Sequence, residues 1–367
     1  MRWLPVTFIV FLVLTGCKKS NELGGEREAD DNPVQSEWKA HGFFLGDNVN
    51  QMNSMPTSDK LFFIGSNGLV AMEPVAEENG LEPFDAHIVR YAKDFDQPEK
   101  ARLPLSPDFF IGYHKASHTI AFTSNLSPLL PYGKVYFSMK RLDPDFSEFA
   151  FIDPINGESM AINNANQVLV PFLATAEGKS VLRLALIDVQ VTKMDSQSAI
   201  DTLQTRIISL DDDAGINLER IQSVEEDFFV STAKNFYKID KAGAVSQVLP
   251  KPIYSVLGLE SVIYGMGEGT MFASTDKGVT WTELYEVPSD LYRSTLTRVD
   301  GKTIGYRNER LWEVSLSQSG MSARELDNQH QQNHTITSIN EFEGYVFLTT
   351  TSGVFFKDPK GVLQDIR

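Results

Sequence analysis

Cysteine is nearly missing from this sequence of 367 residues: Cys17 is the only one. A single thiol close to the N-terminus excludes an intramolecular disulfide, a cysteine-rich zinc site and cysteine catalysis in the rest of the chain. A chain without disulfides depends on its core for stability. About 350 residues are enough to build the core of one large sheet protein.

Basic residues are scarce relative to acidic ones, with 33 Lys plus Arg against 49 Asp plus Glu and a formal net charge of −16. Such a surface repels phosphate backbones, so we expect no nucleic-acid partner. The acidic runs 211–213 and 225–227 could hold Ca²⁺, but runs of this kind are more often solvated turns. We therefore expect neither a metal nor a cofactor.

Long apolar runs are also missing, apart from Leu4 to Leu14, which only Pro5 and Thr7 interrupt. This run is too short to cross a bilayer as a helix and has the length of a signal-peptide core. It ends in Leu14-Thr15-Gly16-Cys17, which resembles a bacterial lipobox. The resemblance implies a signal peptide over 1–16, removed before Cys17, and a diacylglycerol and an acyl chain such as palmitate on Cys17. An ordinary secretory signal with a chance cysteine is the alternative.

Several acyl chains would hold the protein firmly to a membrane surface. Lys18 follows Cys17, and by resemblance to enterobacterial sorting this residue favours the periplasmic leaflet of the outer membrane. Residues 17–38 are polar and acidic with no apolar periodicity, so we predict a lipidated cysteine and a flexible tether. Residues 39–367 contain no second linker of this kind and are expected to form one domain.

Within this domain a unit recurs that consists of a β-type run, a turn rich in Gly, Asn, Ser or Thr, and a second β-type run. We count seven such units, beginning near residues 61, 119, 167, 227, 262, 302 and 345. Their spacing suits four-stranded blades with loops of variable length, and long helical periodicity is scarce. We predict an all-β fold, a β-propeller of about seven four-stranded blades, with six or eight blades or a tandem of β-sandwiches as alternatives. The segment 38–45 should close the ring by pairing with the last blade.

One stretch of eight residues, Ser274-Thr275-Asp276-Lys277-Gly278-Val279-Thr280-Trp281, predicts a strand, a tight turn and a return strand. The Asp276 carboxylate can accept backbone N–H groups across the turn, and Gly278 can supply a positive φ. The pattern resembles the Asp-box, or bacterial neuraminidase repeat, of sialidase-like and related β-propellers. The resemblance implies a structural turn on the face away from the ligand site, formed by Ser274, Asp276, Gly278, Thr280 and Trp281.

A sialidase-like activity is the catalytic function that this resemblance suggests. Such enzymes use an early Arg-Ile-Pro motif, further arginines that clamp a carboxylate, a Tyr–Glu nucleophile pair and an Asp acid/base. Arg102-Leu103-Pro104 departs from the first motif at its middle residue, and Glu283 and Tyr285 share a face only if their strand is regular. Spacing does not show convergence of the remaining candidates, Arg141, Arg183, Arg293, Arg298, Arg307 and Arg310. We expect no catalytic residues.

Two histidine pairs, His114/His118 and His330/His334, invite a metal interpretation. Residues four apart on a strand lie about 13 Å from each other, which is too far to share one ion. We expect exposed, neutral histidines. Aromatic residues in or near the expected loops are better candidates, because Tyr and Phe are typical anchors of protein interfaces: Tyr113, Tyr132, Phe146, Phe149, Phe151, Tyr254 and Tyr292.

The sequence therefore predicts a membrane-anchored periplasmic propeller that binds another protein and is not a catalyst. Two roles remain open: an envelope assembly scaffold, and an inhibitor of a toxic periplasmic protein whose basic charge complements this acidic chain. A sialidase-like domain that binds or hydrolyses glycans is the alternative.

Overall fold

The computed structural model describes residues 38–54, 60–66, 68–75, 83–91, 109–114, 119–124, 134–138, 141, 146–148, 160–194, 197–210, 217–326 and 334–357. The chain divides into the units Met1–Gln35 and Ser36–Arg367, and all described residues belong to the second. Cys17 and the signal peptide lie outside them. Within these ranges, no helix has the length and hydropathy that crossing a membrane requires.

The described strands form seven antiparallel sheets, which we number as blades in chain order. Blades 1 to 3 contain β2 (Val49–Ser54), β3 (Leu61–Gly65), β4 (Gly68–Pro74) and β5 (Phe84–Tyr91); β6 (Phe109–His114), β7 (Thr119–Ser124) and β8 (Lys134–Ser138); and β10 (Ala161–Ile162), β11 (Gln167–Ala176), β12 (Lys179–Met194) and β13 (Gln197–Ser209), with β9 (Phe146–Glu148) paired to β11.

The second half of the molecule is more regular. Blades 4 to 7 contain β14 (Leu218–Val224), β15 (Asp227–Thr232), β16 (Phe236–Ile239) and β17 (Val245–Leu249); β18 (Ile253–Leu259), β19 (Val262–Gly267), β20 (Thr270–Ser274) and β21 (Thr282–Glu286); β22 (Thr295–Val299), β23 (Lys302–Arg307), β24 (Arg310–Leu316) and β25 (Met321–Glu325); and β26 (Ile336–Phe342), β27 (Tyr345–Thr350) and β28 (Gly353–Lys357), completed by β1 (Lys39–Ala40). Two short 3₁₀ helices, η1 (Gly42–Phe44) and η6 (Ser289–Leu291), lie in connections.

The seven repeats predicted from the sequence are the seven sheets. Each predicted pair of β-type runs is the second and third strand of one sheet, from β3–β4 to β27–β28. Several of these strands are deeply buried; all five residues of β3, for example, are buried. The all-β propeller prediction is therefore confirmed, and the tandem of β-sandwiches is not found.

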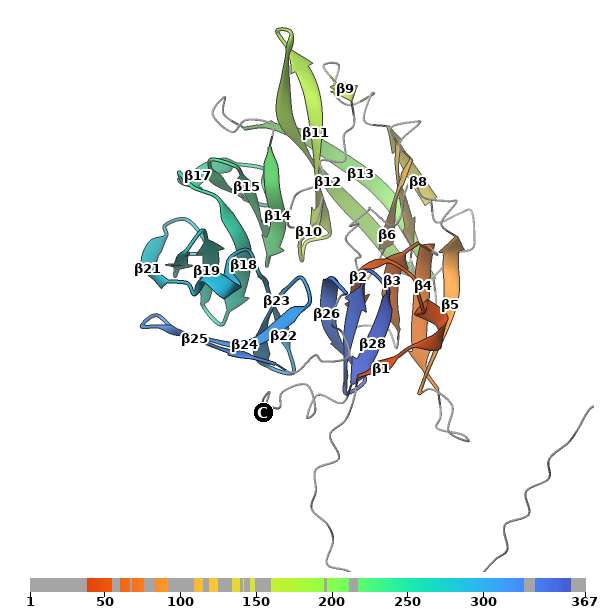
Figure 1. The fold of residues 1–367 in the computed structure, drawn as a ribbon. Coiled ribbons are helices and arrows are strands. Elements are labelled where there is room, and N and C mark those ends of the chain that lie inside the picture. Colours follow the sequence, from red (N-terminus) through yellow and green to blue (C-terminus); the bar gives the residue numbers. More distant parts are fainter. Residues whose placement is uncertain are drawn as a thin grey trace, which may run out of the picture. The chain divides into compact units, whose positions relative to one another are not determined.

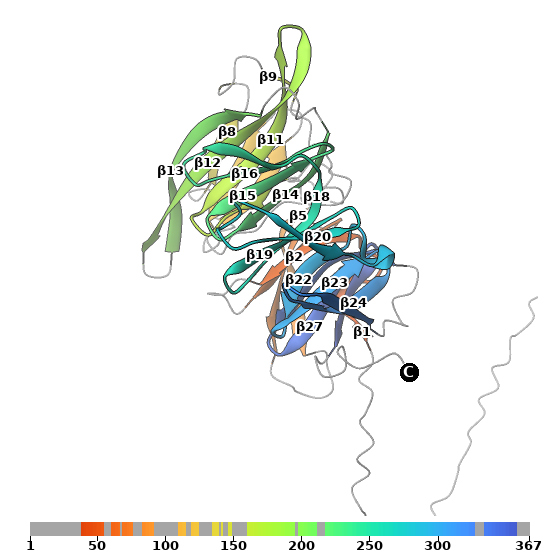
Figure 2. The same cartoon turned by 90° about the vertical axis from the view of Figure 1, so that its left-hand side faces the viewer.

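Contacts between sheets close the ring, as Figure 1 shows for the strands around the common centre. The first strands of neighbouring blades form a series of contacts: β10 contacts β14, β14 contacts β18, β18 contacts β22, β22 contacts β26, and β26 contacts β2. One apolar cluster joins blades 1, 2 and 3 through residues such as Phe62, Phe122 and Val170. The core is thus a series of apolar layers between neighbouring sheets. Figure 2 shows the strands of these sheets from the side.

The N-terminal segment closes the ring, as the sequence predicted. Lys39 and Ala40 of β1 pair with Phe356 and Phe355 of β28, so the first strand of the domain is the outermost strand of the last blade. Trp38 is buried in the apolar cluster between blades 6 and 7. Phe44 of η1 is buried in the cluster between blades 7 and 1. The closing segment therefore contacts three blades.

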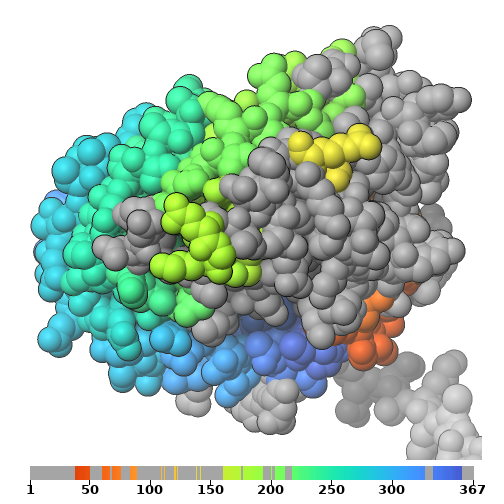
Figure 3. Space-filling view, turned by 90° about the horizontal axis from the view of Figure 1, so that it is seen from above, coloured from red at the N-terminus to blue at the C-terminus, as the bar shows by residue number. Residues whose placement is uncertain are grey.

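Blade 3 has the longest strands, with 16 residues in β12 and 13 in β13. β13 contacts β7 and β8 of blade 2, and Val189 of β12 and Ile200 of β13 are buried in the apolar cluster that blade 3 shares with blade 2. On its other side, blade 3 packs against blade 4 through an apolar cluster that includes Leu184 and Tyr237. Figure 3 shows the green residues of blade 3 beside the blue-green residues of blade 4.

Candidate functional site

Four inner strands carry a β-bulge at their second residue. The ladder registers shift between Val49 and Gln51, Leu218 and Arg220, Ile253 and Ser255, and Ile336 and Ser338, which leaves one residue of each strand without a partner across the ladder. Bulges redirect a side chain and are frequent beside functional sites. The bulged residues, at one end of the inner strands, are Asn50, Glu219, Tyr254 and Thr337.

The richest group of polar side chains lies at this end of blades 4, 5 and 6. We call it the rim and define it as Glu219, Arg220, Tyr254, Arg293 and Arg307. Arg220 is buried, with 5% of its surface exposed. Its Nη1 donates to the Tyr254 carbonyl oxygen at 2.5 Å and its Nη2 to Thr295 Oγ1 at 3.1 Å. Arg220 of blade 4 thereby ties together the first strands of blades 5 and 6.

Arg293 lies on the Tyr254 side chain. Its Cζ is 4.7 Å from the centre of the Tyr254 ring, and its Nη2 donates to the Tyr254 hydroxyl at 3.3 Å. The hydrogen bond to Tyr254 and the nearby carboxylates of Glu219 and Glu268 raise the pKa of Arg293, against an opposing effect of burial. Nearby, Arg307 Nη1 donates to the Tyr292 carbonyl oxygen at 2.5 Å.

Glu219 Oε2 at the rim and Ser294 Oγ beside it are buried and have no hydrogen-bond partner among the described residues. Ser294 is fully buried and lies between Arg293 and Thr295 in the chain. A buried polar atom without a partner costs free energy that a bound group can recover. The rim thus combines guanidinium groups, an aromatic face and unsatisfied oxygen atoms, which is an arrangement suited to binding.

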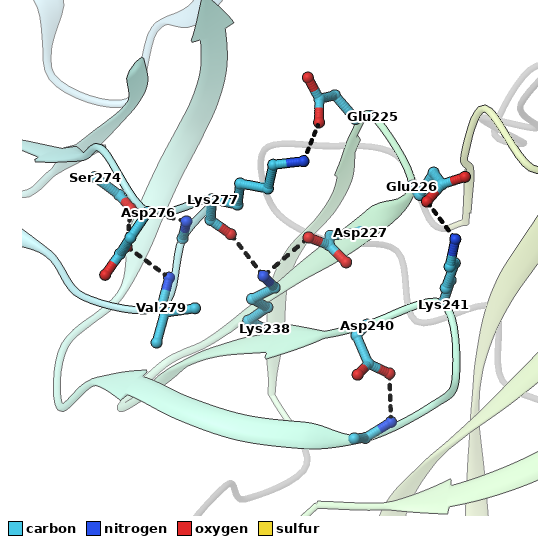
Figure 4. Close-up of polar contacts among 12 residues, drawn as sticks. Glu225, Glu226, Asp227, Lys238, Asp240, Lys241, Ser274, Asp276, Lys277 and Val279 are labelled. Carbon is cyan, nitrogen blue, oxygen red and sulfur yellow. Dashed lines mark hydrogen bonds and ion pairs between the residues drawn. The ribbon is translucent and has the colours of Figure 1, made fainter. Parts of the chain in front are cut away.

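The turn around Asp276 lies at the opposite end of the inner strands, because Lys277 of this turn pairs with Glu225, which follows the last residue of β14. The Asp276 carboxylate accepts from Val279 N at 3.1 Å, from Thr280 N at 2.9 Å and from Thr280 Oγ1 at 2.6 Å. Ser274 Oγ donates to Asp276 and accepts from Gly278 N. Hydrogen bonds from Thr280 and Ser274 hold the pKa of Asp276 well below its usual range. Figure 4 shows this turn.

The same turn joins two blades. Trp281 Nε1 donates to the Gly278 carbonyl oxygen at 3.1 Å. The indole ring meets Phe229 and Phe236 of blade 4 edge to face, with ring centres 6.0 and 5.4 Å apart. All five residues of the predicted turn, Ser274, Asp276, Gly278, Thr280 and Trp281, therefore lie together, and Trp281 packs between sheets. Their arrangement is structural, and it is separate from the rim.

The acidic run that begins at Glu225 is neutralised by lysines, as Figure 4 shows. Asp227 pairs with Lys238 at 2.9 Å, Glu226 pairs with Lys241 at 2.7 Å, and Glu225 lies 3.8 Å from Lys277. Lys238 also donates to the Lys277 carbonyl oxygen at 2.6 Å. The run is therefore a set of ion pairs at a turn. No group of three or more metal-binding side chains occurs in the described ranges, and run 211–213 lies outside them.

The enzyme-like candidates from the sequence do not assemble into one site. A register shift interrupts β21, so Glu283 and Tyr285 do not alternate regularly; Glu283 pairs with Lys251, and the Tyr285 hydroxyl donates to the Ser317 carbonyl oxygen. Arg310 binds Glu325, Arg298 donates to Gly301, Arg183 lies in β12 and Arg141 is exposed. Among the described arginine candidates, Arg293 and Arg307 lie near each other at the rim, because Arg307 donates to the carbonyl oxygen of Tyr292, which precedes Arg293. Arg102 to Pro104 lie outside the described residues.

Several exposure predictions were wrong. Tyr254 is the second residue of β18 and is buried, and Tyr292 follows η6 and is half-buried. Tyr113 is the second-last residue of β6, and Phe146 is the first residue of β9. His334 is half-buried rather than exposed, with Nδ1 2.5 Å from Ser352 Oγ, and His114 ends β6. The structure does not describe the remaining candidates, His118, His330, Tyr132, Phe149 and Phe151.

Sequence reasoning missed Glu219 and Arg220. The repeat in the sequence consists of the second and third strands of each blade. Glu219 and Arg220 lie in β14, the first strand of blade 4, and are therefore not part of the repeat. The available signal was an adjacent acid and base, Glu219-Arg220, in the segment in which Leu218, Ile221 and Val224 are the apolar residues.

Comparisons with known proteins agree on the fold. No family model matches the chain, and no curated protein matches it in sequence. A solved structure of virginiamycin B lyase from Staphylococcus aureus superposes with a TM-score of 0.57 at 10% identity, over 88% of this chain and 98% of that one. A chain of the mitotic checkpoint complex gives 0.53 at 7% identity, over 95% and 98%. The extracellular domain of a one-component system from B. thetaiotaomicron gives 0.51 at 10% identity, over 88% of this chain and 40% of that one. At such identities the similarity establishes the β-propeller fold, which is shared by a lyase and by a component of a protein assembly.

Proposed function

We propose that this protein is a lipid-anchored protein of the bacterial envelope whose propeller binds another protein at the rim. The observation that supports binding is the rim itself, where side chains of three blades meet and two buried oxygen atoms, Glu219 Oε2 and Ser294 Oγ, have no partner within the described part of the chain. Tyrosine and arginine are the side chains most enriched at energetically important interface positions. A closed ring holds such side chains in fixed positions.

The location in the envelope follows from Leu14-Thr15-Gly16-Cys17 and from Lys18, which support lipidation at Cys17 and the periplasmic leaflet of the outer membrane. Labelling with palmitate checks this part. The wild-type protein should carry the label and sediment with membranes, and the Cys17→Ser variant should do neither. An unlabelled wild-type protein would contradict the anchor and leave the binding role open.

Crosslinking followed by affinity purification from membranes tests the binding role. We expect mass spectrometry to identify a specific protein with the wild type. The Glu219→Arg variant should lose that protein, because the change reverses a charge at the rim. The matched Glu260→Arg variant should retain it, because Glu260 is exposed at the opposite end of β18. Equal recovery with both variants would place the binding surface elsewhere.

A scaffold and an inhibitor of a toxic protein both fit this proposal. A glycan-binding or glycan-hydrolysing function is the second candidate, and the observation in its favour is that Arg220, Arg293 and Arg307 lie close together. However, each of these guanidinium groups donates to an atom of this chain. Turnover of a sialoside, with no protein recovered in the purification, would make the second candidate the better one.

A further inference from the structure

The rim already holds a cation, the guanidinium group of its own Arg293. This group lies over the face of Tyr254 and donates to the Tyr254 hydroxyl, which is the usual arrangement of a cation–π contact. The carboxylates of Glu219 and Glu268 contribute a negative field at the same place. The surroundings of Arg293 are thus those of a site for a positively charged side chain.

Glu219 has binding capacity that Arg293 does not use. Its Oε2 is buried and accepts no hydrogen bond from the described residues, and the same is true of Ser294 Oγ. A carboxylate oxygen needs a donor, and guanidinium and ammonium groups provide several charged donors without an acceptor. The unmet requirement at Glu219 is therefore for a cation.

Arg293 is held less firmly than its neighbour Arg220. Within the described part of the chain its side chain makes one hydrogen bond, of 3.3 Å, and it is half-buried. Arg220 is buried and donates to two acceptors on two strands. Arg293 can leave Tyr254 while Arg220 keeps the strands in place.

We propose that the rim binds an arginine or lysine side chain of the partner protein, which displaces Arg293 from the face of Tyr254 and donates to Glu219. This inference rests on the proposed binding function and specifies its chemistry: the partner presents a basic loop. The net charge of −16 favours the approach of such a partner.

The test uses a fluorescein-labelled, N-acetylated tetra-arginine amide as the probe and fluorescence anisotropy as the readout, with tetra-glutamate as the acidic counterpart. The wild type should bind tetra-arginine and not tetra-glutamate. Glu219→Gln should weaken binding about tenfold, because it removes one charged acceptor. Arg293→Ala should strengthen it several-fold, because it removes the competing guanidinium group.

Two control variants separate the rim from the general acidity of the surface. Glu260→Gln and Arg298→Ala make the same changes in charge near the other ends of β18 and β22, and each should change the affinity less than twofold. If Glu219→Gln and Glu260→Gln weaken binding equally, or if Arg293→Ala does not strengthen it, the proposal is wrong. Preferential binding of tetra-glutamate would also overturn it and would favour an acidic ligand instead.

The fold of each variant is checked by its urea midpoint, and Tyr254→Phe provides a milder change that removes only the hydroxyl that Arg293 binds. It should also strengthen tetra-arginine binding. Failure of this proposal is distinguishable from failure of the proposed function. The wild type could capture a partner that Glu219→Arg loses, while the peptide binds all of these variants equally. That result would support the binding role and reject the cation site.

Discussion

At the scale of single residues, Asp276 stabilises a turn. Its carboxylate accepts hydrogen bonds from four donors of the same loop: Ser274 Oγ, Val279 N, Thr280 N and Thr280 Oγ1. Hydrogen bonds from Thr280 and Ser274 lower the pKa of Asp276 in the folded protein, whereas an unfolded chain has a pKa of about 3.9. The contribution of Asp276 to stability is therefore present above about pH 4 and is lost as the pH falls below that value.

We expect Asp276→Asn to lower the thermal midpoint at pH 6, because an amide cannot accept all of these hydrogen bonds. The difference between wild type and variant should shrink between about pH 4 and pH 2, because the Asp276 carboxylate becomes protonated in the unfolded wild-type chain while it stays ionised in the folded one. Calorimetry at both ends of this range measures it. A difference that stays constant with pH would show that the charge of Asp276 is not what stabilises the turn.

Gly278 contributes both conformation and space. Its φ is +81°, and a Cβ atom there would lie 2.5 Å from Cε1 of Phe229 in the neighbouring blade. We expect Gly278→Ala to reduce the free energy of unfolding by about 2–4 kcal/mol, from left-handed strain and overpacking together. Urea denaturation measures the loss. Gly320→Ala is the control, because a Cβ at Gly320 meets no atom within 4 Å; equal losses in the two variants would refute the role of Phe229.

The sequence predicted the residues of this turn because their partners lie within four positions along the chain. It did not predict the rim. Arg220 is separated by 34 residues from Tyr254 and by 75 from Thr295, and only the packing of three blades brings them together. The bulges that redirect Glu219 and Tyr254 depend on pairing across each sheet, which has no local pattern.

At the scale of elements, second and third strands such as β3 and β4 were predictable because both of their faces are buried and they read as apolar runs. Outer strands were not: β17 is exposed at its first three residues and has little apolar character. The closing strand β1 has only two residues, both exposed. Its position was inferred from the need to cover the edge of the last sheet and not from its composition.

The closing segment leads to a prediction about Trp38, whose side chain is 6% exposed between blades 6 and 7. Trp38→Ala should cost about 3–5 kcal/mol of unfolding free energy, as expected for removal of a buried large aromatic side chain. Leu45→Ala should cost little, because Leu45 is 68% exposed. Chemical denaturation of both variants checks this. A small loss for Trp38→Ala would mean that the ring closes without the indole.

At the scale of the whole molecule, the number of blades followed from counting repeats in the sequence. The net charge, in contrast, is a property of the whole chain and affects how fast a partner associates. With a net charge of −16, association with a basic partner should be accelerated at low ionic strength. Raising the salt concentration from about 50 to about 500 mM should slow association more than it speeds dissociation, because screening acts on the approach. Surface plasmon resonance with the captured partner measures both rates. Rates that do not respond to salt would exclude electrostatic steering.

The pairing of Lys39 with Phe356 also determines where the polypeptide can be cut and rejoined. Lys357 Nζ lies 5.8 Å from the centre of the Trp38 ring, so the beginning and the end of the described ring are neighbours. A short linker between them would yield a circular permutant. New chain ends in the exposed β24–β25 connection would then leave all seven sheets with their strands in the same spatial order.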